Sequence, residues 1–191
     1  DLDETILDNS VFEARQIASD TNATAEEWNE WLSGTEARAM PGAIEFLEFA
    51  RRRGVFVYFV TNRHERFRAS TLATLAKLGV QADEQHGMSL LMFGERTGWV
   101  GEKGSRRAFV AERHSLLLVV GNDLNDFVDS GGLTAVQRRE LAQQNADKFG
   151  KEWILIPSPI WGTWMDAIYD YREDLNASER RAHEIKALQV E

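Results

Sequence analysis

The stretch Val55-Phe56-Val57-Tyr58-Phe59-Val60 is a short, continuous apolar run, and the polar segment Thr61-Asn62-Arg63 follows it at once. A run of this length without polar alternation is typical of a strand that is buried on both faces, as in a parallel sheet. Residues 116–120 and residues 153–156 form two further runs of the same character. These runs predict a buried parallel sheet.

Helical segments separate the apolar runs, and residues that start or stop helices bound them. Gly54 and Gly79 each follow a helical pattern, in the position where glycine commonly ends a helix. Two pairs have the spacing of a capping box at a helix start, namely Thr24 with Glu27 and Thr134 with Gln137. Strands that alternate with helices in this order predict an α/β fold, a three-layer Rossmann-like parallel sheet with right-handed crossovers.

The length of 191 residues suits one core with a small attachment. Residues 9–38 carry no strand pattern, so we predict that they form a small helical cap. We predict one main domain over residues 1–173, which includes this cap, and a polar helical tail over residues 174–191.

The composition excludes several classes of protein. Asp and Glu number 31 against 22 Lys and Arg, and the net charge of -9 repels polyanions, so nucleic acid is not an expected partner. The chain has no cysteine, which excludes disulfides, thiolate zinc sites and cysteine nucleophiles. No apolar stretch approaches the ~20 residues of a membrane span. Any catalyst here therefore uses oxygen, nitrogen or metal chemistry.

The candidate functional residues are the polar ones that follow apolar runs, because ligands of open parallel sheets bind outside the carboxyl ends of the strands. Asp1 and Asp3 are one residue apart, so in extended backbone both carboxylates point to the same side, where they repel unless a cation intervenes. A second acidic loop contains Asn122, Asp123 and Asp126. Two such loops at one sheet edge favour Mg²⁺, which prefers one or two carboxylates, waters and a substrate phosphate. Each motif alone is also an ordinary helix start or Asn/Asp turn.

Three further residues offer groups that bind an anion. Thr61 and Asn62 provide a hydroxyl, an amide and backbone N–H groups, and Lys103 provides a positive charge. Each residue alone is more often part of a turn or of the surface, so the prediction of a phosphate site depends on their combination with the carboxylates.

Together these segments resemble the haloacid dehalogenase superfamily and, within it, the class C bacterial acid phosphatases. The resemblance spans about residues 1–169 and depends on the following segments: Asp1-Leu2-Asp3-Glu4-Thr5-Ile6-Leu7-Asp8-Asn9-Ser10, Trp28 and Trp31, Met40-Pro41-Gly42-Ala43, Val60-Thr61-Asn62-Arg63, Lys103 with Arg106-Arg107, residues 121–127, Phe149-Gly150-Lys151, Pro157 and Trp161-Gly162-Thr163-Trp164. The long first segment makes the resemblance specific.

The resemblance implies a Mg²⁺-dependent acid phosphatase that hydrolyses small phosphate monoesters, with nucleoside monophosphates as candidate substrates. It implies that Asp1 is the nucleophile and forms an aspartyl phosphate, and that Asp3 protonates the leaving group and later activates water. Thr61 would hold the phosphoryl group, and Lys103 would balance its charge. A carboxylate nucleophile divides one displacement into two steps, and a general acid typically contributes ~10²- to 10⁴-fold.

The same resemblance implies that Mg²⁺ is bound by Asp1, by the main-chain carbonyl of Asp3 and by the second acidic loop. The family has Asp directly after the glycine of that loop, whereas this chain has Asn122, and Asp126 keeps the later acidic position. An amide retains an oxygen ligand but removes a full charge, so we expect lower activity. A natural variant and an engineered, trapped enzyme both fit this departure.

The family places its nucleophile at the end of an apolar first strand, whereas here the corresponding residue is Asp1. We therefore expect that an upstream part, including any signal or lipid anchor, is not shown. Relatives are commonly exported, often as outer-membrane lipoproteins, so the resemblance implies a periplasmic or outer-membrane-anchored protein. The oligomeric state is left open, with a dimer as one option.

Tryptophans are candidate contacts for a nucleobase. Of the six in the chain, Trp161 lies in a loop rich in Pro and Gly and is the best candidate for stacking, which is worth ~1 to 3 kcal/mol. Trp28 and Trp31 have the spacing of helix core anchors.

Two other functions compete. Arg63-His64 offers the Arg-His pair of histidine phosphatases, but Glu65 stands where a glycine should follow. A non-catalytic storage or binding protein on the same fold, similar to plant vegetative storage proteins, is favoured only by Asn122.

Overall fold

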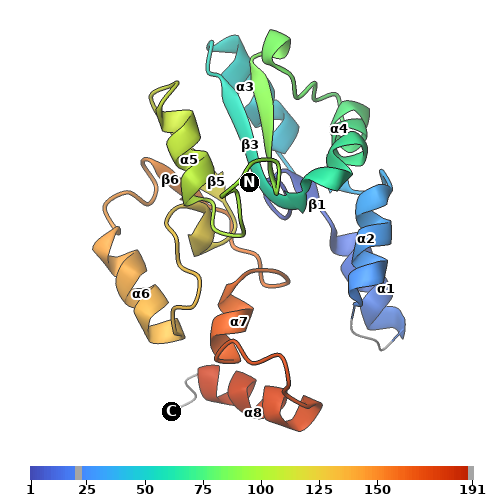
Figure 1. Ribbon diagram of the computed structural model, residues 1–191, viewed down its shortest axis with the longest axis vertical. Coiled ribbons are helices and arrows are strands. Elements are labelled where there is room, and N and C mark those ends of the chain that lie inside the picture. The colour runs from blue at the N-terminus through green and yellow to red at the C-terminus, as the bar shows by residue number, and fades with distance from the viewer. Residues whose placement is uncertain (20–22, 189–191) are drawn as a thin grey trace. The chain divides into compact units, whose positions relative to one another are not determined.

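The computed structural model describes residues 1–19 and 23–188. Residues 20–22 of the predicted cap and 189–191 of the predicted tail lie outside the described part. The chain forms two compact units, Asp1–Leu116 and Leu117–Glu191, and each is considered by itself. Helices alternate with parallel pairs of strands in both units (Figure 1), which confirms the predicted α/β class.

A parallel pair of strands organises the first unit, with β3 (Val57–His64) beside β4 (Met88–Phe93). The chain enters β3 from α3 (Ala43–Arg52) and leaves it through a short 3-10 turn, η1 (Glu65–Phe67), into α4 (Arg68–Lys77). A second 3-10 turn, η2 (Glu84–His86), leads into β4, and α5 (Gly104–Ala111) follows it. Parallel pairing places the carboxyl ends of β3 and β4 at one edge, where Thr61 lies.

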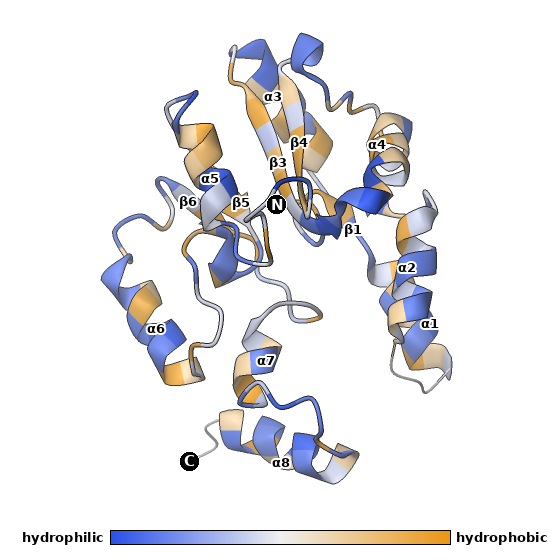
Figure 2. Cartoon of the chain, in the orientation of Figure 1, coloured by the Kyte–Doolittle hydropathy of each residue, from blue (hydrophilic) through white to orange (hydrophobic). Residues whose placement is uncertain are grey.

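The core of the first unit joins its sheet to its N-terminal segment. Leu2, Phe59, Leu75 and Met92 are each at most 1% exposed and belong to one cluster. Figure 2 shows the hydrophobic colouring of β3 and β4 that this burial requires. Burying a side chain of this size contributes ~1.5 to 3 kcal/mol, so the cluster fixes Leu2, and with it the two aspartates that flank it.

The predicted cap begins beside a small antiparallel pair, β1 (Leu7–Asp8) with β2 (Arg38–Ala39). Between these strands lie α1 (Ser10–Ser19) and α2 (Ala25–Ser33). The predicted capping box is confirmed, because the Thr24 side chain accepts from the backbone of Glu27 while the Glu27 side chain accepts from the backbone of Thr24. Trp31 is buried against Phe12, with ring centroids 5.7 Å apart.

The second unit contains the parallel pair β5 (Val119–Gly121) and β6 (Trp153–Leu155). Its helices are η3 (Leu124–Asp126), a 3-10 turn, and α6 (Ala135–Gln144), α7 (Trp164–Ile168) and α8 (Ala177–Ala187). The capping box predicted at Thr134 is confirmed. Aromatic packing stabilises the unit, with the rings of Phe127 and Trp153 stacked 5.3 Å apart.

The boundaries of the strands differ from those predicted. The prediction of a buried strand over residues 116–120 is wrong for Leu116, Leu117 and Leu118, which are 48%, 65% and 37% exposed. The ladder between β5 and β6 covers only Val119–Gly121. β3 in turn begins at Val57 and continues to His64, so the polar segment predicted to follow the strand lies within its last residues.

Over the parts of the chain that the structure describes, no helix combines the length and the apolar character that a membrane span requires.

Candidate active site

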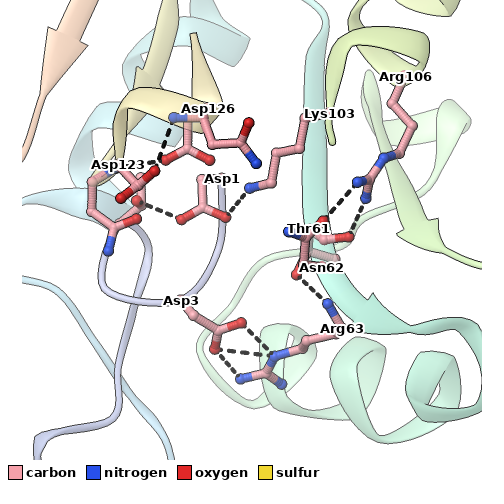
Figure 3. Close-up of polar contacts among 12 residues, drawn as sticks. Asp1, Asp3, Thr61, Asn62, Arg63, Lys103, Arg106, Asp123 and Asp126 are labelled. Carbon is pink, nitrogen blue, oxygen red and sulfur yellow. Dashed lines mark hydrogen bonds and ion pairs between the residues drawn. The ribbon is translucent and has the colours of Figure 1, made fainter. Parts of the chain in front are cut away.

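Asp1 is a buried carboxylate whose charge is balanced by a lysine. Its Oδ1 accepts a hydrogen bond from Lys103 Nζ at 2.6 Å, and its Oδ2 accepts one from Thr5 Oγ1 at 2.9 Å. Figure 3 shows the Lys103 ammonium pointing at the Asp1 carboxylate. The side chains of Asp1 and Lys103 are only 8% and 6% exposed. Fully buried Leu2 anchors the segment, and the turn that follows is closed by the backbone N–H of Ile6, which donates to the carbonyl of Leu2 at 2.8 Å.

Asp3 is held by an arginine. Arg63 Nη2 donates to Asp3 Oδ1 at 2.6 Å, and Arg63 Nε lies 3.1 Å from Oδ1 and 3.0 Å from Oδ2. Burial alone would raise the pKa of Asp3, but the charge and hydrogen bonds of Arg63, with a hydrogen bond from Asn9, hold it below its usual value. Asp3 is therefore a carboxylate in the free protein. It is ready to accept a proton, and it must gain one before it can donate.

Glu4 lies beside this pair in a left-handed conformation, with φ of 56°. Burial, followed by the nearby charge of Asp3, raises its pKa to about 7, while hydrogen bonds from Asn9 oppose the shift. A non-glycine residue in this conformation costs energy unless its surroundings hold it. Here Asn9 holds it, since its backbone N and its Nδ2 donate to Glu4 Oε1 at 3.2 and 3.0 Å.

Thr61 and Asn62 lie near the end of β3, where a buried arginine fixes them. Thr61 is fully buried, and its Oγ1 accepts from the backbone N–H of Arg63 at 3.1 Å. Arg106 donates to the carbonyl of Thr61 and, at 2.6 Å, to Asn62 Oδ1. The other half of the Asn62 amide donates to the carbonyl of Gly101 at 2.9 Å. The Asn62 side chain would therefore have to exchange these contacts to bind an anion.

In the second unit, the acidic loop folds over Gly121. Asp126 Oδ2 accepts from the backbone N–H groups of Asn122 and Asp123 at 2.9 and 3.0 Å. A Cβ at position 121 would lie 2.3 Å from that same oxygen, so only glycine fits there. Asn122 Nδ2 donates to the carbonyl of Trp161 at 3.3 Å, and the Trp161 side chain is half exposed. Asn122, Asp126 and Trp161, all predicted site residues, therefore lie in one neighbourhood.

Asp123 in the same loop has a structural role. Both of its carboxylate oxygens lie 3.2 Å from Arg138 Nη2, and Oδ1 also accepts from Thr163 Oγ1 at 2.6 Å. The side chains of Asp123 and Arg138 are each 8% exposed. These contacts join the loop to α6 and to the start of α7.

The family model of the haloacid dehalogenase superfamily, subfamily IIIB (acid phosphatase), matches residues 1–164. This chain belongs to that family. Two solved structures are similar to it: the class C acid phosphatase from Bacillus anthracis, and the same enzyme with tungstate bound. Each is 29% identical, has a TM-score of 0.88, and is matched over 100% of this chain and 78% of its own.

Membership of the acid phosphatase family identifies the general class of reaction. The chain is a phosphatase with the Rossmann-like α/β fold of the superfamily, and it acts on small-molecule phosphate esters. The predicted resemblance is confirmed, and the enzyme is favoured over both the storage protein and the histidine phosphatase. Consistent with this, Arg63 pairs with Asp3, and His64 Nδ1 accepts from the backbone of Arg66.

Phosphatases of this superfamily typically use a divalent metal ion. No group of three or more His, Cys, Asp or Glu side chains with metal-binding geometry occurs among residues 1–19 and 23–188. The predicted donors are all oxygens: the carboxylates of Asp1 and Asp126, the carbonyl of Asp3 and the amide of Asn122. Such a set fits Mg²⁺, which takes few carboxylates and fills its shell with water and phosphate, and it does not fit zinc, which prefers nitrogen and sulfur.

Several residues that hold this machinery in place were not among the predicted site residues, and Arg106, which contacts Thr61 and Asn62, is one of them. Asn9 and Arg63 contact Asp3, and Arg138 contacts Asp123. Arg63 and Asn9 lie inside the family motifs, so the sequence offered a signal from which their role could have been predicted. Arg138 lies in a polar helix and has no such signal in the sequence.

Proposed function

We propose that this phosphatase hydrolyses phosphate monoesters in a Mg²⁺-dependent reaction that passes through an aspartyl phosphate on Asp1. The observation that carries the proposal is the contrast between two neighbouring carboxylates. Asp1 forms an ion pair with Lys103, which suits a nucleophile that receives a phosphoryl group. Asp3 forms a separate ion pair with Arg63. Two carboxylates in different environments are the usual basis for dividing nucleophile and acid/base roles.

In the first step, a carboxylate oxygen of Asp1 bonds to phosphorus while the bond from phosphorus to the leaving oxygen breaks. The electron pair of that bond goes to the leaving oxygen, which takes from Asp3 a proton that Asp3 first accepted from the singly protonated phosphate group of the bound monoester. Lys103 offsets the negative charge of the phosphoryl oxygens, and the Thr61 hydroxyl donates to one of them. In the second step, Asp3 accepts a proton from water as the water oxygen bonds to phosphorus, which releases phosphate and restores Asp1.

Mg²⁺ would be held by Asp1, the carbonyl of Asp3, Asn122 and Asp126. When bound, it supplies positive charge that stabilises the equatorial phosphoryl oxygens and screens Asp1 from the incoming anion. Because Asn122 is neutral, this set has one negative charge fewer than the family pattern.

We further propose that nucleoside monophosphates are substrates, with the base stacked on Trp161. The half-exposed ring of Trp161 and its backbone contact with the Asn122 side chain support this choice. We also propose a periplasmic or outer-membrane-anchored location, supported by the similarity to a class C acid phosphatase. Cell fractionation of the source organism tests the location.

A phosphate-release assay tests the function. We expect release from p-nitrophenyl phosphate and from nucleoside monophosphates in the presence of Mg²⁺, and loss of release after chelation. Release that persists undiminished in a chelator would contradict the metal requirement. In the same panel, Trp161→Ala should lower kcat/KM for nucleoside monophosphates by about tenfold relative to a small sugar phosphate, since stacking is worth ~1 to 3 kcal/mol. An unchanged ratio would exclude the stacking role.

Asn122→Asp is expected to raise both the Mg²⁺ affinity and the turnover. The change restores a full charge to the ligand set, and the gain should reach tenfold or more if ~1.4 kcal/mol of transition-state stabilisation returns. The measurement is the Mg²⁺ dependence of turnover.

Asn125→Asp is the control for this change, because it adds the same charge to the same loop at a position outside the proposed ligand set. If both variants gain equally, the effect comes from net charge. If Asn122→Asp has unchanged affinity and rate, Asn122 is not a ligand.

A further inference from the structure

Asn9 connects Asp3 to helix α2. Its Nδ2 donates to Asp3 Oδ1 at 3.0 Å, and its Oδ1 accepts from Trp31 Nε1 at 2.8 Å. Asn9 is 1% exposed and Trp31 is 7% exposed, so water does not readily replace these contacts. Because the indole N–H is only a donor, it requires an acceptor and so defines which end of the amide is oxygen. The NH₂ end must then face Asp3.

The two oxygens of Asp3 have unequal surroundings. Oδ1 accepts from Asn9 Nδ2 at 3.0 Å, from Arg63 Nη2 at 2.6 Å and from Arg63 Nε at 3.1 Å. Oδ2 accepts one hydrogen bond, from Arg63 Nε at 3.0 Å. A carboxylate oxygen has about two lone-pair sites, so Oδ1 is saturated with donors while Oδ2 keeps acceptor capacity.

We propose that Asn9, oriented by the Trp31 indole, is a positioning residue that binds Asp3 Oδ1 and thereby leaves Oδ2 as the oxygen that exchanges protons with the leaving group and with water. The cap helix thus contributes to acid/base chemistry without contacting substrate. This inference deepens the proposed function and rests on Asp3 being its general acid.

The expected defect depends on the leaving group. When the bond to phosphorus breaks, an alkoxide is a poor leaving group and needs the proton from Asp3 Oδ2, whereas p-nitrophenolate is a stable anion and needs little assistance. A mispositioned Asp3 should therefore slow hydrolysis of an alkyl phosphate much more than that of p-nitrophenyl phosphate. The parameter to compare is kcat/KM, because it includes leaving-group departure but excludes the later hydrolysis of the aspartyl phosphate.

Two variants separate positioning from general structural support. Trp31→Phe removes the indole N–H but keeps an aromatic ring to pack on Phe12, and we expect a loss of about threefold or more in kcat/KM for glycerol phosphate relative to p-nitrophenyl phosphate. For Asn9→Ala we expect the same relative loss in kcat/KM to reach about tenfold or more. This is part of the ~10²- to 10⁴-fold that a general acid contributes. Asn9 also supports Glu4, so if Asn9→Ala does not fold, Trp31→Phe still decides the question.

Trp99→Phe is the matched control. Trp99 is 6% exposed, as buried as Trp31, but it belongs to a separate cluster with Leu91 and Val110. It should leave the ratio of the two substrates unchanged. Equal losses on both substrates in Trp31→Phe and Asn9→Ala, or no loss on either, would overturn the positioning role. If the unaltered protein hydrolyses neither ester, the proposed function itself fails.

Discussion

Asp1→Asn is expected to lower kcat by roughly four orders of magnitude or more, the scale on which loss of a catalytic nucleophile acts. An amide cannot form the aspartyl phosphate, so both chemical steps are blocked. The variant also leaves Lys103, whose side chain is only 6% exposed, without its carboxylate partner. Circular dichroism and thermal unfolding must therefore accompany the rate measurement, so that a lost nucleophile is distinguished from a lost fold.

The matched control for this change is Asp174→Asn, because Asp174 is 74% exposed and forms an ion pair with Arg172 on the surface. It should retain full activity. Acid quench during turnover of labelled substrate adds a direct readout, since the unaltered protein should trap covalent phosphate and Asp1→Asn should not. A folded Asp1→Asn variant with near-normal turnover would show that the covalent mechanism is wrong.

Arg138→Leu is expected to reduce the free energy of unfolding by about 3 to 5 kcal/mol. The substitution leaves the carboxylate of Asp123 buried without its counter-charge, and an uncompensated buried charge carries a penalty of that size. Chemical denaturation monitored by tryptophan fluorescence measures it.

Two comparisons test the reason for this loss. Arg139→Leu, at the exposed next position of α6, should change stability by no more than ~0.5 kcal/mol. Asp123→Asn combined with Arg138→Leu should recover part of the loss, because the buried group is then neutral. If the double variant is as unstable as the sum of both single changes, packing of the Arg138 stem and not its charge explains the effect.

Local pattern predicted the elements whose signals are complete within a few residues. Both capping boxes were of this kind, as was the run that forms β6. β4 was missed because Ser89 interrupts its apolar character, although Leu90 to Phe93 offered a signal. β5 is shorter than the apolar run that predicted it, and its pairing partner β6 lies more than thirty residues away in the sequence.

In the candidate site, too, local motifs could be predicted from the sequence and long-range contacts could not. Asp1, Asp3, Thr61 and Lys103 stand in short motifs, so their involvement was predictable, whereas their partners are distant in sequence. Lys103 reaches Asp1 across 102 positions, and Arg63 reaches Asp3 across 60. No periodicity encodes which cation pairs with which carboxylate, because the fold determines that choice.

The buried guanidinium of Arg106 has a consequence for how the anion site responds to substrate. It donates to the carbonyl of Thr61 on β3 and to the carbonyl of Val100 at 2.7 Å, in the loop that leads to Lys103. Arg106 therefore joins the backbone that carries Thr61 to the backbone of the loop that leads to Lys103. These contacts are present without ligand, so the two segments that would surround a phosphoryl group need not be brought together when the anion binds. Lysine has a single point charge in place of a planar fork of donors, so it could not bind the carbonyls of Thr61 and Val100 in the same way.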